Sequence, residues 1–213
     1  MFKTIKTVLT VSFLLFASQV MAEQKAAVQT KLASESVLPV DVVMKTSKGD
    51  MTIRLNSEKA PVTVKNFLSY VDKGFYKDVV FHRVMPGFMI QGGGMTADMS
   101  EKPTSNPIKN ESANGVRNRR GTIAMARTPD PDSATAQFFI NLVNNEFLNN
   151  RPGRPGYAVF GEVIKGEEVM DEIASVKTGR RGPHANVPIK SVTILAVERV
   201  TTAPNKEKKA KQP

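Results

Sequence analysis

The chain has 213 residues and a formal net charge of +10, from 30 lysines and arginines against 20 aspartates and glutamates. This length suits one domain with tails. Hydrophobic residues make up 40% of the chain and charged residues 23%, which excludes a disordered chain or a bundle of membrane helices. The absence of cysteine excludes disulfides, thiolate metal sites and a cysteine nucleophile. Because the only histidines are His82 and His184, a histidine-rich metal site is also excluded.

The first 22 residues have the pattern of a secretory signal peptide. Lys3 and Lys6 precede an apolar run over 8–17, and Val20 and Ala22 are small residues before the predicted cleavage point. An uncleaved anchor is the alternative, but a membrane span needs roughly 20 apolar residues and this run is about half as long. We therefore expect cleavage after Ala22, no stable membrane insertion afterwards, and a periplasmic location, where a domain without cysteine is ordinary.

Two peripheral segments flank the predicted domain, which covers residues 38–200. Residues 23–37 have no sustained apolar face and are predicted to be a flexible lead-in. Residues 201–213 contain four lysines and one glutamate, which is typical of a disordered basic tail in solvent. The signal peptide contributes +2 to the net charge and the tail +3, while the lead-in is neutral, so the domain itself has a charge of +5.

The domain begins with a predicted hairpin and contains two predicted helices. Two β-rich runs lie on either side of residues 47–50. A helix of about twelve residues is expected from Pro61, ending before Gly74. A second helix is expected within 167–179, with Val169 and Val176 on its apolar face and Gly179 as its stop.

Six further short apolar runs predict strands, at 79–85, 87–91, 121–126, 136–143, 157–164 and 191–200. With the hairpin they make about eight strands, and eight strands with only two helices favour an antiparallel barrel or sandwich over a βαβ protein. A closed barrel also leaves no strand edge unpaired. Residues 92–121, which begin with three glycines, are predicted to form a long surface excursion.

Four motifs in the domain occur in the order FHRVMPGFMIQGG (81–93), AQFFIN (136–141), NEFL (145–148) and YAVFGEV (157–163). In this order and over residues 38–200 the chain resembles the cyclophilins, which are peptidyl-prolyl cis–trans isomerases, and most closely their bacterial periplasmic members. The resemblance implies a mainly β fold, a closed eight-stranded antiparallel β-barrel capped by two α-helices, in agreement with the strands counted above.

The resemblance also implies the residues of the site. Arg83 would be the catalytic arginine, and Gln91 would orient it. The residues expected to bind substrate are Phe88, Met89, Ala126, Arg127, Gln137, Phe139, Phe147, Leu148 and Tyr157. The family needs no metal and no cofactor, and the implied partners are proline-containing peptides and unfolded exported proteins.

These residue types suit the rotation of an X–Pro bond. A peptide bond resists rotation with a barrier of ~18–20 kcal/mol because its C–N bond is partly double. A guanidinium that donates to the proline nitrogen, or to the carbonyl as it turns, favours the twisted state, and arginine stays charged and presents a rigid fork of donors. An apolar cup would meanwhile hold the proline ring still.

Other interpretations of these features were weighed. A non-catalytic chaperone or scaffold would use the same cup to hold proline-rich segments, but it would not need Arg83. Nucleic-acid binding is disfavoured because the strands lack stacking-aromatic motifs. We expect a monomer, and we interpret His82 as a hydrogen-bonded structural histidine whose side chain faces away from that of Arg83.

Two positions depart from the best-known cyclophilins. Phe147 and Tyr157 stand where many members have tryptophan and histidine. In the family that tryptophan donates a hydrogen bond to cyclosporin, which phenylalanine cannot do, so we expect weak cyclosporin binding with isomerase activity kept. A further hypothesis is that arginines near the pocket rim favour acidic residues beside the target proline; they are Arg117, Arg119, Arg120, Arg127, Arg151 and Arg154.

Overall fold

The computed structural model describes residues 40–200. The predicted signal peptide (1–22), the lead-in (23–37) and the basic tail (201–213) lie outside the described residues, as do positions 38 and 39 at the start of the predicted domain. Within 40–200 no helix is both long enough and apolar enough to cross a membrane.

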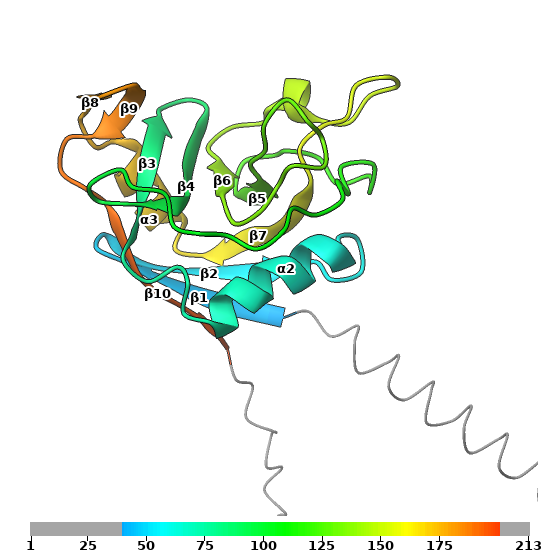
Figure 1. Ribbon diagram of the computed structural model, residues 1–213, viewed down its shortest axis with the longest axis horizontal. Coiled ribbons are helices and arrows are strands. Elements are labelled where there is room, and N and C mark those ends of the chain that lie inside the picture. The colour runs from blue at the N-terminus through cyan, green and yellow to red at the C-terminus, as the bar shows by residue number, and fades with distance from the viewer. Residues whose placement is uncertain (1–39, 201–213) are drawn as a thin grey trace, which may run out of the picture. The chain divides into compact units, whose positions relative to one another are not determined.

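Eight strands close into one antiparallel barrel, in the order β1-β10-β3-β4-β6-β5-β7-β2 (Figure 1). The prediction of a closed eight-stranded barrel with two helices is therefore confirmed. The barrel strands are β1 (Val40–Thr46), β2 (Gly49–Leu55), β3 (Val79–Met85), β4 (Met89–Thr96), β5 (Thr122–Met125), β6 (Phe138–Asn141), β7 (Val159–Lys165) and β10 (Thr193–Arg199). The other elements are α2 (Pro61–Asp72), η1 (Glu146–Leu148), α3 (Glu167–Ala174), β8 (Thr178–Arg181) and β9 (His184–Pro188).

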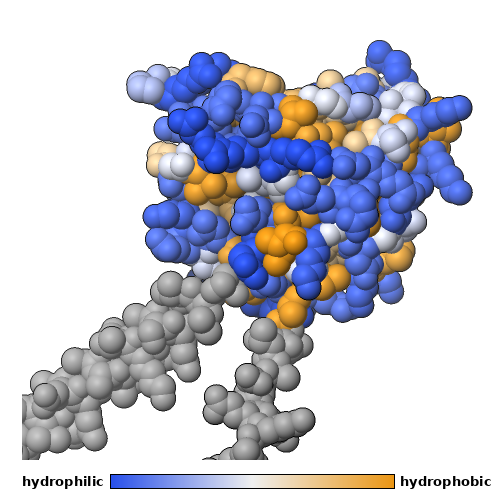
Figure 2. Space-filling view, turned by 180° about the vertical axis from the view of Figure 1, so that it is seen from behind, coloured by the Kyte–Doolittle hydropathy of each residue, from blue (hydrophilic) through white to orange (hydrophobic). Residues whose placement is uncertain are grey.

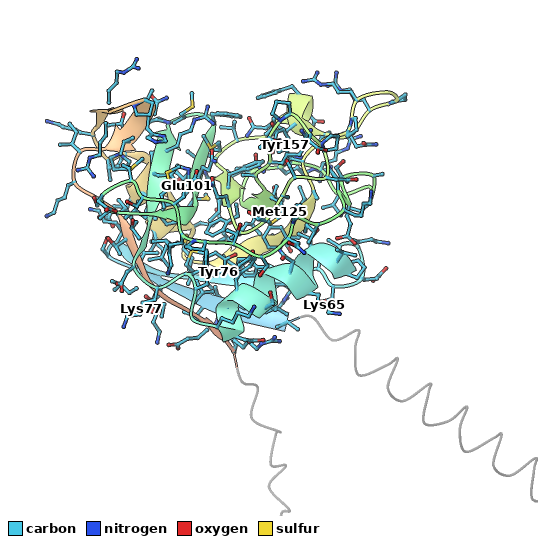
Figure 3. The ribbon with its side chains drawn as sticks, in the orientation of Figure 1. Lys65, Tyr76, Lys77, Glu101, Met125 and Tyr157 are labelled. Carbon is cyan, nitrogen blue, oxygen red and sulfur yellow. The ribbon has the colours of Figure 1, made fainter. Side chains whose placement is uncertain are left out.

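The helix α2 has the predicted length of 12 residues and covers part of the barrel with aromatic packing. Its residue Phe67 is fully buried, with ring centroids 5.1 Å from Tyr76 and 5.2 Å from Phe160. Tyr76 lies between α2 and the barrel in Figure 3 and donates its hydroxyl to the carbonyl of Ala136, at 3.0 Å. The apolar stripe read from the sequence is thus the face that closes the barrel core.

The helix α3 ends earlier than the sequence predicted. It stops at Ala174, and Gly179, expected as its stop, lies instead in β8. Strands β8 and β9 form a two-stranded ribbon outside the barrel, which the sequence analysis missed. The ribbon is mostly polar and its pairing depends on backbone hydrogen bonds, so no apolar alternation marks it.

The predicted start of the surface excursion, at residue 92, is wrong. Gly92, Gly93 and Gly94 instead continue strand β4. All three are buried; a Cβ would be tightly confined at Gly92 and would collide with neighbouring atoms at Gly93 and Gly94. At Gly93, whose φ is +88°, a Cβ would meet the ring of Phe138. The glycines therefore let β4 pass close to its neighbours, and the excursion begins only after Thr96.

The side of the molecule that Figure 1 hides is mainly hydrophilic, with its hydrophobic residues in small separate patches (Figure 2). Among the described residues the large exposed apolar side chains include Ile189 (68% exposed) and Leu195 (49% exposed). Apolar residues scattered singly over a surface are normal and need no partner to explain them.

Candidate active site

One row of paired residues crosses four neighbouring strands and forms the floor of the site. Arg83 of β3 pairs with Gln91 of β4, Gln91 pairs with Phe139 of β6, and Phe139 pairs with Ala124 of β5. The residues that alternate with this row, such as Ile90 and Phe138, belong to the barrel core. Because successive strand residues face opposite sides of a sheet, the row faces outward, where a second apolar cluster covers it.

A cavity of about 170 Å³ opens over this row. Part of its wall is apolar and tightly packed, because Met89, Phe139 and Leu148 are only 2%, 5% and 8% exposed. All nine lining residues are among the eleven predicted from the sequence; they are Arg83, Phe88, Met89, Gln91, Ala126, Arg127, Phe139, Leu148 and Tyr157. The cavity is smaller than the ~300 Å³ at which drug-sized pockets begin, and suits one ring or side chain.

The two remaining predicted residues lie beside the cavity. Phe147 is half exposed at the rim, and its ring stacks on that of Phe88 with centroids 5.5 Å apart. Gln137 is partly buried and reaches the site through Gln91. Tyr157 packs against the outer apolar cluster that contains Phe139 and Leu148, whereas Met125 belongs to the barrel core (Figure 3).

A chain of hydrogen bonds orients the guanidinium of Arg83. Its Nη1 donates to Oε1 of Gln91 at 3.4 Å, and Nε2 of Gln91 donates to Oε1 of Gln137 at 3.1 Å. A guanidinium can only donate, so Gln91 must turn its oxygen to Arg83 and its amide nitrogen to Gln137. Gln137 then presents its own Nε2 as a donor for a further acceptor.

The side chain of Arg127 packs against the cavity wall and hydrogen-bonds to nearby backbone carbonyls. Its guanidinium lies 4.5 Å from the ring centroid of Tyr157. It also donates to the carbonyls of Pro155 (2.8 Å), Gly156 (3.3 Å) and Thr128 (2.9 Å). The sequence hypothesis counted Arg127 among the arginines available to substrate, but these contacts commit its side chain to the loop that precedes Tyr157.

A buried asparagine network holds the backbone behind the cavity, and the sequence analysis missed it. Asn118 is fully buried and donates Nδ2 to the carbonyls of Leu148 and Tyr157, both at 3.3 Å. Asn141, also fully buried, donates to Oδ1 of Asn118 at 3.2 Å. Asn145 donates to Oδ1 of Asn141 at 2.7 Å and to the carbonyl of Phe88 at 3.0 Å. Three walls of the cavity are therefore tied to one network.

His82 occupies a β-bulge beside Arg83. Phe81 pairs with Gly92 and Arg83 with Gln91, which leaves His82 as the extra residue on β3. His82 is 5% exposed, and its Nδ1 has no hydrogen-bond partner among residues 40–200. The expectation of a hydrogen-bonded histidine is therefore wrong for this nitrogen. Burial, with the nearby charges of His184 and Arg83, lowers the pKa of His82 to about 4.

The chemistry open to this site is electrostatic and steric. Arg83 is a cation in a cavity that also has apolar walls, and the amides of Gln91 and Gln137 connect to it. No group of three or more His, Asp or Glu residues is placed to hold a metal ion in the described part of the chain. The arrangement can grip an apolar ring and direct a donor at a polar group beside that ring.

Comparison with known proteins gives the family. Residues 41–198 match the model of the cyclophilin type peptidyl-prolyl cis-trans isomerase/CLD family. Peptidyl-prolyl cis-trans isomerase A of Dickeya dadantii is 54% identical over 157 residues, covering 74% of this chain and 83% of that protein. Peptidyl-prolyl cis-trans isomerase B of Escherichia coli is 54% identical over 160 residues, covering 73% of this chain and 97% of that protein.

Solved structures agree with the sequence relatives. A crystal structure of a Cryptosporidium parvum cyclophilin type peptidyl-prolyl cis-trans isomerase superposes with a TM-score of 0.65 at 25% identity, covering 78% of this chain and 99% of that chain. A second structure of that protein, in the presence of the dipeptide Ala-Pro, has a TM-score of 0.63 at 26% identity and covers 74% of this chain and 97% of that chain. The chain described here therefore belongs to the cyclophilin-type peptidyl-prolyl cis–trans isomerase family.

Proposed function

We propose that this protein accelerates the cis–trans rotation of X–Pro bonds in exported proteins, with Arg83 stabilising the twisted amide. The observation that carries the proposal is the position of Arg83: it lines a cavity of about 170 Å³ beside the apolar side chains of Met89 and Phe139, and its guanidinium is oriented by Gln91. The similar proteins named as peptidyl-prolyl isomerases support the reaction, and the Ala-Pro dipeptide used with the Cryptosporidium protein supports proline as the ligand.

The mechanism follows from the electronic structure of the amide. In the planar ground state the proline nitrogen shares its lone pair with the carbonyl, but at a twist of about 90° that resonance is lost and the lone pair returns to nitrogen. A donor aimed at the twisted state stabilises it more than the ground state. One preorganised donor of this kind contributes about 2.7–4 kcal/mol, which is a hundredfold to thousandfold in rate.

The apolar walls supply the second requirement, a fixed axis of rotation. Met89, Phe139 and Leu148 would enclose the proline ring, so that the residue before proline turns while the ring stays in place. Nε2 of Gln137 would donate to a substrate carbonyl, and the backbone of Ala126 and Arg127 would form the ledge along which the peptide lies. These contacts bind the moving segment without a covalent step.

The signal-peptide pattern of residues 1–22 supports a role in the periplasm. The proposal predicts that the protein, expressed with its leader in a Gram-negative host, appears in the periplasmic fraction with Glu23 as its first residue. N-terminal sequencing of the fractionated protein tests this directly. Recovery of the full chain in the cytoplasm would contradict the exported role without affecting the isomerase proposal.

Turnover distinguishes catalysis from simple binding of proline segments. The assay is protease-coupled, on an X–Pro tetrapeptide, with protein at about one hundredth of the substrate concentration. The first-order rate constant should be well above that of the uncatalysed reaction, which takes tens to hundreds of seconds. A non-catalytic scaffold would bind the peptide in a titration but leave the rate unchanged at this ratio. That result would replace the isomerase proposal with the binding-module interpretation.

A further inference from the structure

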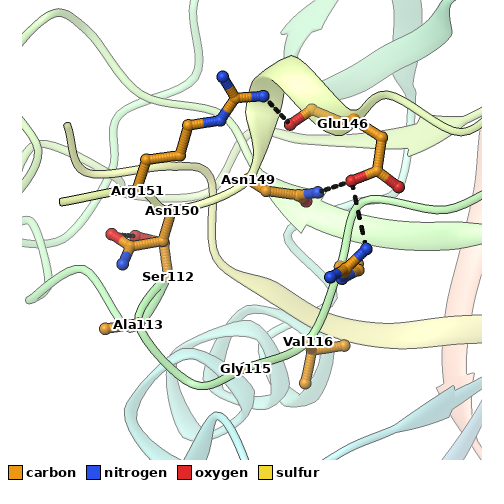
Figure 4. A pocket seen from close by; sticks show the side chains of 9 residues that line it. Ser112, Ala113, Gly115, Val116, Glu146, Asn149, Asn150 and Arg151 are labelled. Carbon is orange, nitrogen blue, oxygen red and sulfur yellow. Dashed lines mark hydrogen bonds and ion pairs between the residues drawn. The ribbon is translucent and has the colours of Figure 1, made fainter.

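A second cavity, drawn in Figure 4, has Glu146 in its lining, two positions before Leu148 of the proline cavity. It has a volume of about 400 Å³, enough for one or two amino-acid side chains, and its surface is mainly polar. None of its residues belongs to the predicted site; they are Ser112, Ala113, Gly115, Val116, Arg117, Glu146, Asn149, Asn150 and Arg151. It is built by the loop before β5 and by the loop after η1, two segments far apart in the sequence.

The single-turn helix η1 separates the two cavities. Glu146, at its start, lines the polar cavity, whereas Leu148, at its end, lines the proline cavity. Phe147 between them is half exposed and stacks on Phe88, which forms an apolar ridge between the cavities. The two cavities are thus lined by residues two positions apart on η1, and an extended peptide, which advances about 3.3 Å per residue, would pass from one to the other within a few residues.

The charges in the polar cavity favour an anionic side chain. Its one carboxylate, on Glu146, accepts from Nδ2 of Asn149 at 2.7 Å and lies 3.6 Å from Nη1 of Arg117. Arg151 donates from Nη2 to the carbonyl of Glu146 at 3.2 Å and makes no other side-chain hydrogen bond or ion pair within residues 40–200. The guanidinium of Arg151 therefore keeps donors for a ligand while Glu146 is already partnered.

The fold holds Arg151 at a defined place. The backbone groups of Arg151 and Arg154 exchange two hydrogen bonds, N–H to O at 3.1 Å and 2.9 Å, which close a tight turn at the cavity edge. Of the six arginines that the sequence hypothesis grouped together, Arg127 is committed to its loop and Arg120 is paired with Asp171 at 2.9 Å. Of the six, Arg117 and Arg151 line the polar cavity.

We propose that this polar cavity is a second substrate subsite, which accepts an Asp or Glu side chain two to four residues from the target proline. The proposal rests on the proposed isomerase function and names a substrate class for it: acidic segments that contain proline. A carboxylate suits the cavity because the guanidinium of Arg151 is rigid, always charged and able to donate two parallel hydrogen bonds.

Matched peptides test the subsite. Each pair has one X–Pro bond and differs only by Glu or Gln at one position, placed two, three or four residues before or after proline. At low ionic strength we expect kcat/KM to be about 1.4-fold to fivefold higher for Glu than for Gln at one or two of these positions, as for an exposed ion pair. This preference should shrink in 0.5 M salt, because exposed charges are screened there.

Substitutions identify the residues responsible. Arg151→Gln and Arg117→Gln should bring the Glu-to-Gln ratio towards one, and Glu146→Gln, which removes the only carboxylate of the cavity, should raise it. The matched control is Arg180→Gln, which removes an exposed arginine of the β8–β9 ribbon, on the other side of the barrel from η1 in Figure 1, and should leave the ratio unchanged.

Two failures can be told apart. Equal rates on Glu and Gln peptides at every position, with both isomerised well above the uncatalysed rate, would overturn the subsite and leave the isomerase proposal standing. A wild-type preference that Arg151→Gln and Arg117→Gln both leave intact would also overturn it. No acceleration of any peptide would instead contradict the proposed function itself.

Discussion

Replacing Asn118 by leucine tests whether the asparagine network supports the cavity walls. Leucine has a similar shape but cannot donate or accept a hydrogen bond. The carbonyl of Leu148 would keep a partner, the N–H of Tyr157 at 3.0 Å, and Asn141 would keep the hydroxyl of Thr122 at 2.9 Å. The carbonyl of Tyr157 would lose its donor, because Nδ2 of Asn118 is its only hydrogen-bond partner among the described residues.

The expected cost follows from these losses. A buried carbonyl left without a partner costs about 1–3 kcal/mol, and the lost bond between Asn118 and Asn141 adds about 0.5–1.5 kcal/mol. We therefore expect the free energy of unfolding to fall by about 1.5–4.5 kcal/mol. For a domain of this size that corresponds to a fall in Tm of about 3–18 °C. Because Leu148 and Tyr157 line the cavity, kcat/KM should fall as well.

Urea unfolding followed by far-UV circular dichroism measures this change, and thermal unfolding checks it. The control is Asn150→Leu, the same substitution at an exposed asparagine, which should change the free energy of unfolding by less than about 0.5 kcal/mol. If Asn118→Leu costs no more than the control, then the network does not hold the backbone as described, and the reasoning fails.

Three further predictions follow from His82, Gly94 and Phe147. Because burial holds the pKa of His82 at about 4, the unfolded chain, with an ordinary pKa of 6.5, binds a proton that the folded chain does not. The free energy of unfolding should therefore fall by up to about 3 kcal/mol between pH 6.5 and pH 4, and urea titrations should show that His82→Gln removes this part of the pH dependence. The same change of unfolding free energy with pH in His82→Gln as in the wild type would contradict this role of His82. Gly94→Ala should lower kcat/KM with little change in fold, because the new Cβ would overlap Cγ of Gln137 and displace the hydrogen bond between Gln137 and Gln91. The control is Gly74→Ala, where a Cβ meets open space; it should affect stability but not the isomerase assay. Phe147→Trp should tighten cyclosporin binding by about twofold to tenfold, the value of one hydrogen bond, in a fluorescence titration of the new tryptophan; equal affinities would contradict the role given to this position.

The barrel could be predicted from the sequence because its strands bury one face, and burial leaves an alternation of apolar side chains. The two β-rich runs around residues 47–50 correspond to β1 and β2 for this reason, since their buried residues alternate with less buried ones. The β8–β9 ribbon leaves no such trace, since Val187 and Pro188 are the only buried residues of its two strands and they are adjacent. The early end of α3 was missed because Val176 packs against the core from outside the helix, so its burial looked like helical periodicity.

The cavity-lining residues could be predicted because the motifs are short and local, but their supports could not. Asn118 bonds to the backbone of residues 148 and 157, which are 30 and 39 positions away, and nothing in the local sequence indicates such contacts. The arginines show the same limit. Arg127 and Arg151 are equivalent as letters, yet one is bonded to the carbonyls of its own wall and the other lines a cavity.

The central claim is that Arg83 lowers the barrier to X–Pro rotation, and the rate of cis–trans exchange on the protein tests it most directly. NMR exchange spectroscopy at saturating protein gives this rate separately from peptide affinity, for the wild type and for Arg83→Ala. The account predicts exchange about a hundredfold to a thousandfold slower in the variant, with the peptide Kd within about threefold of the wild type. Exchange in Arg83→Ala as fast as in the wild type, at the same Kd, would contradict it.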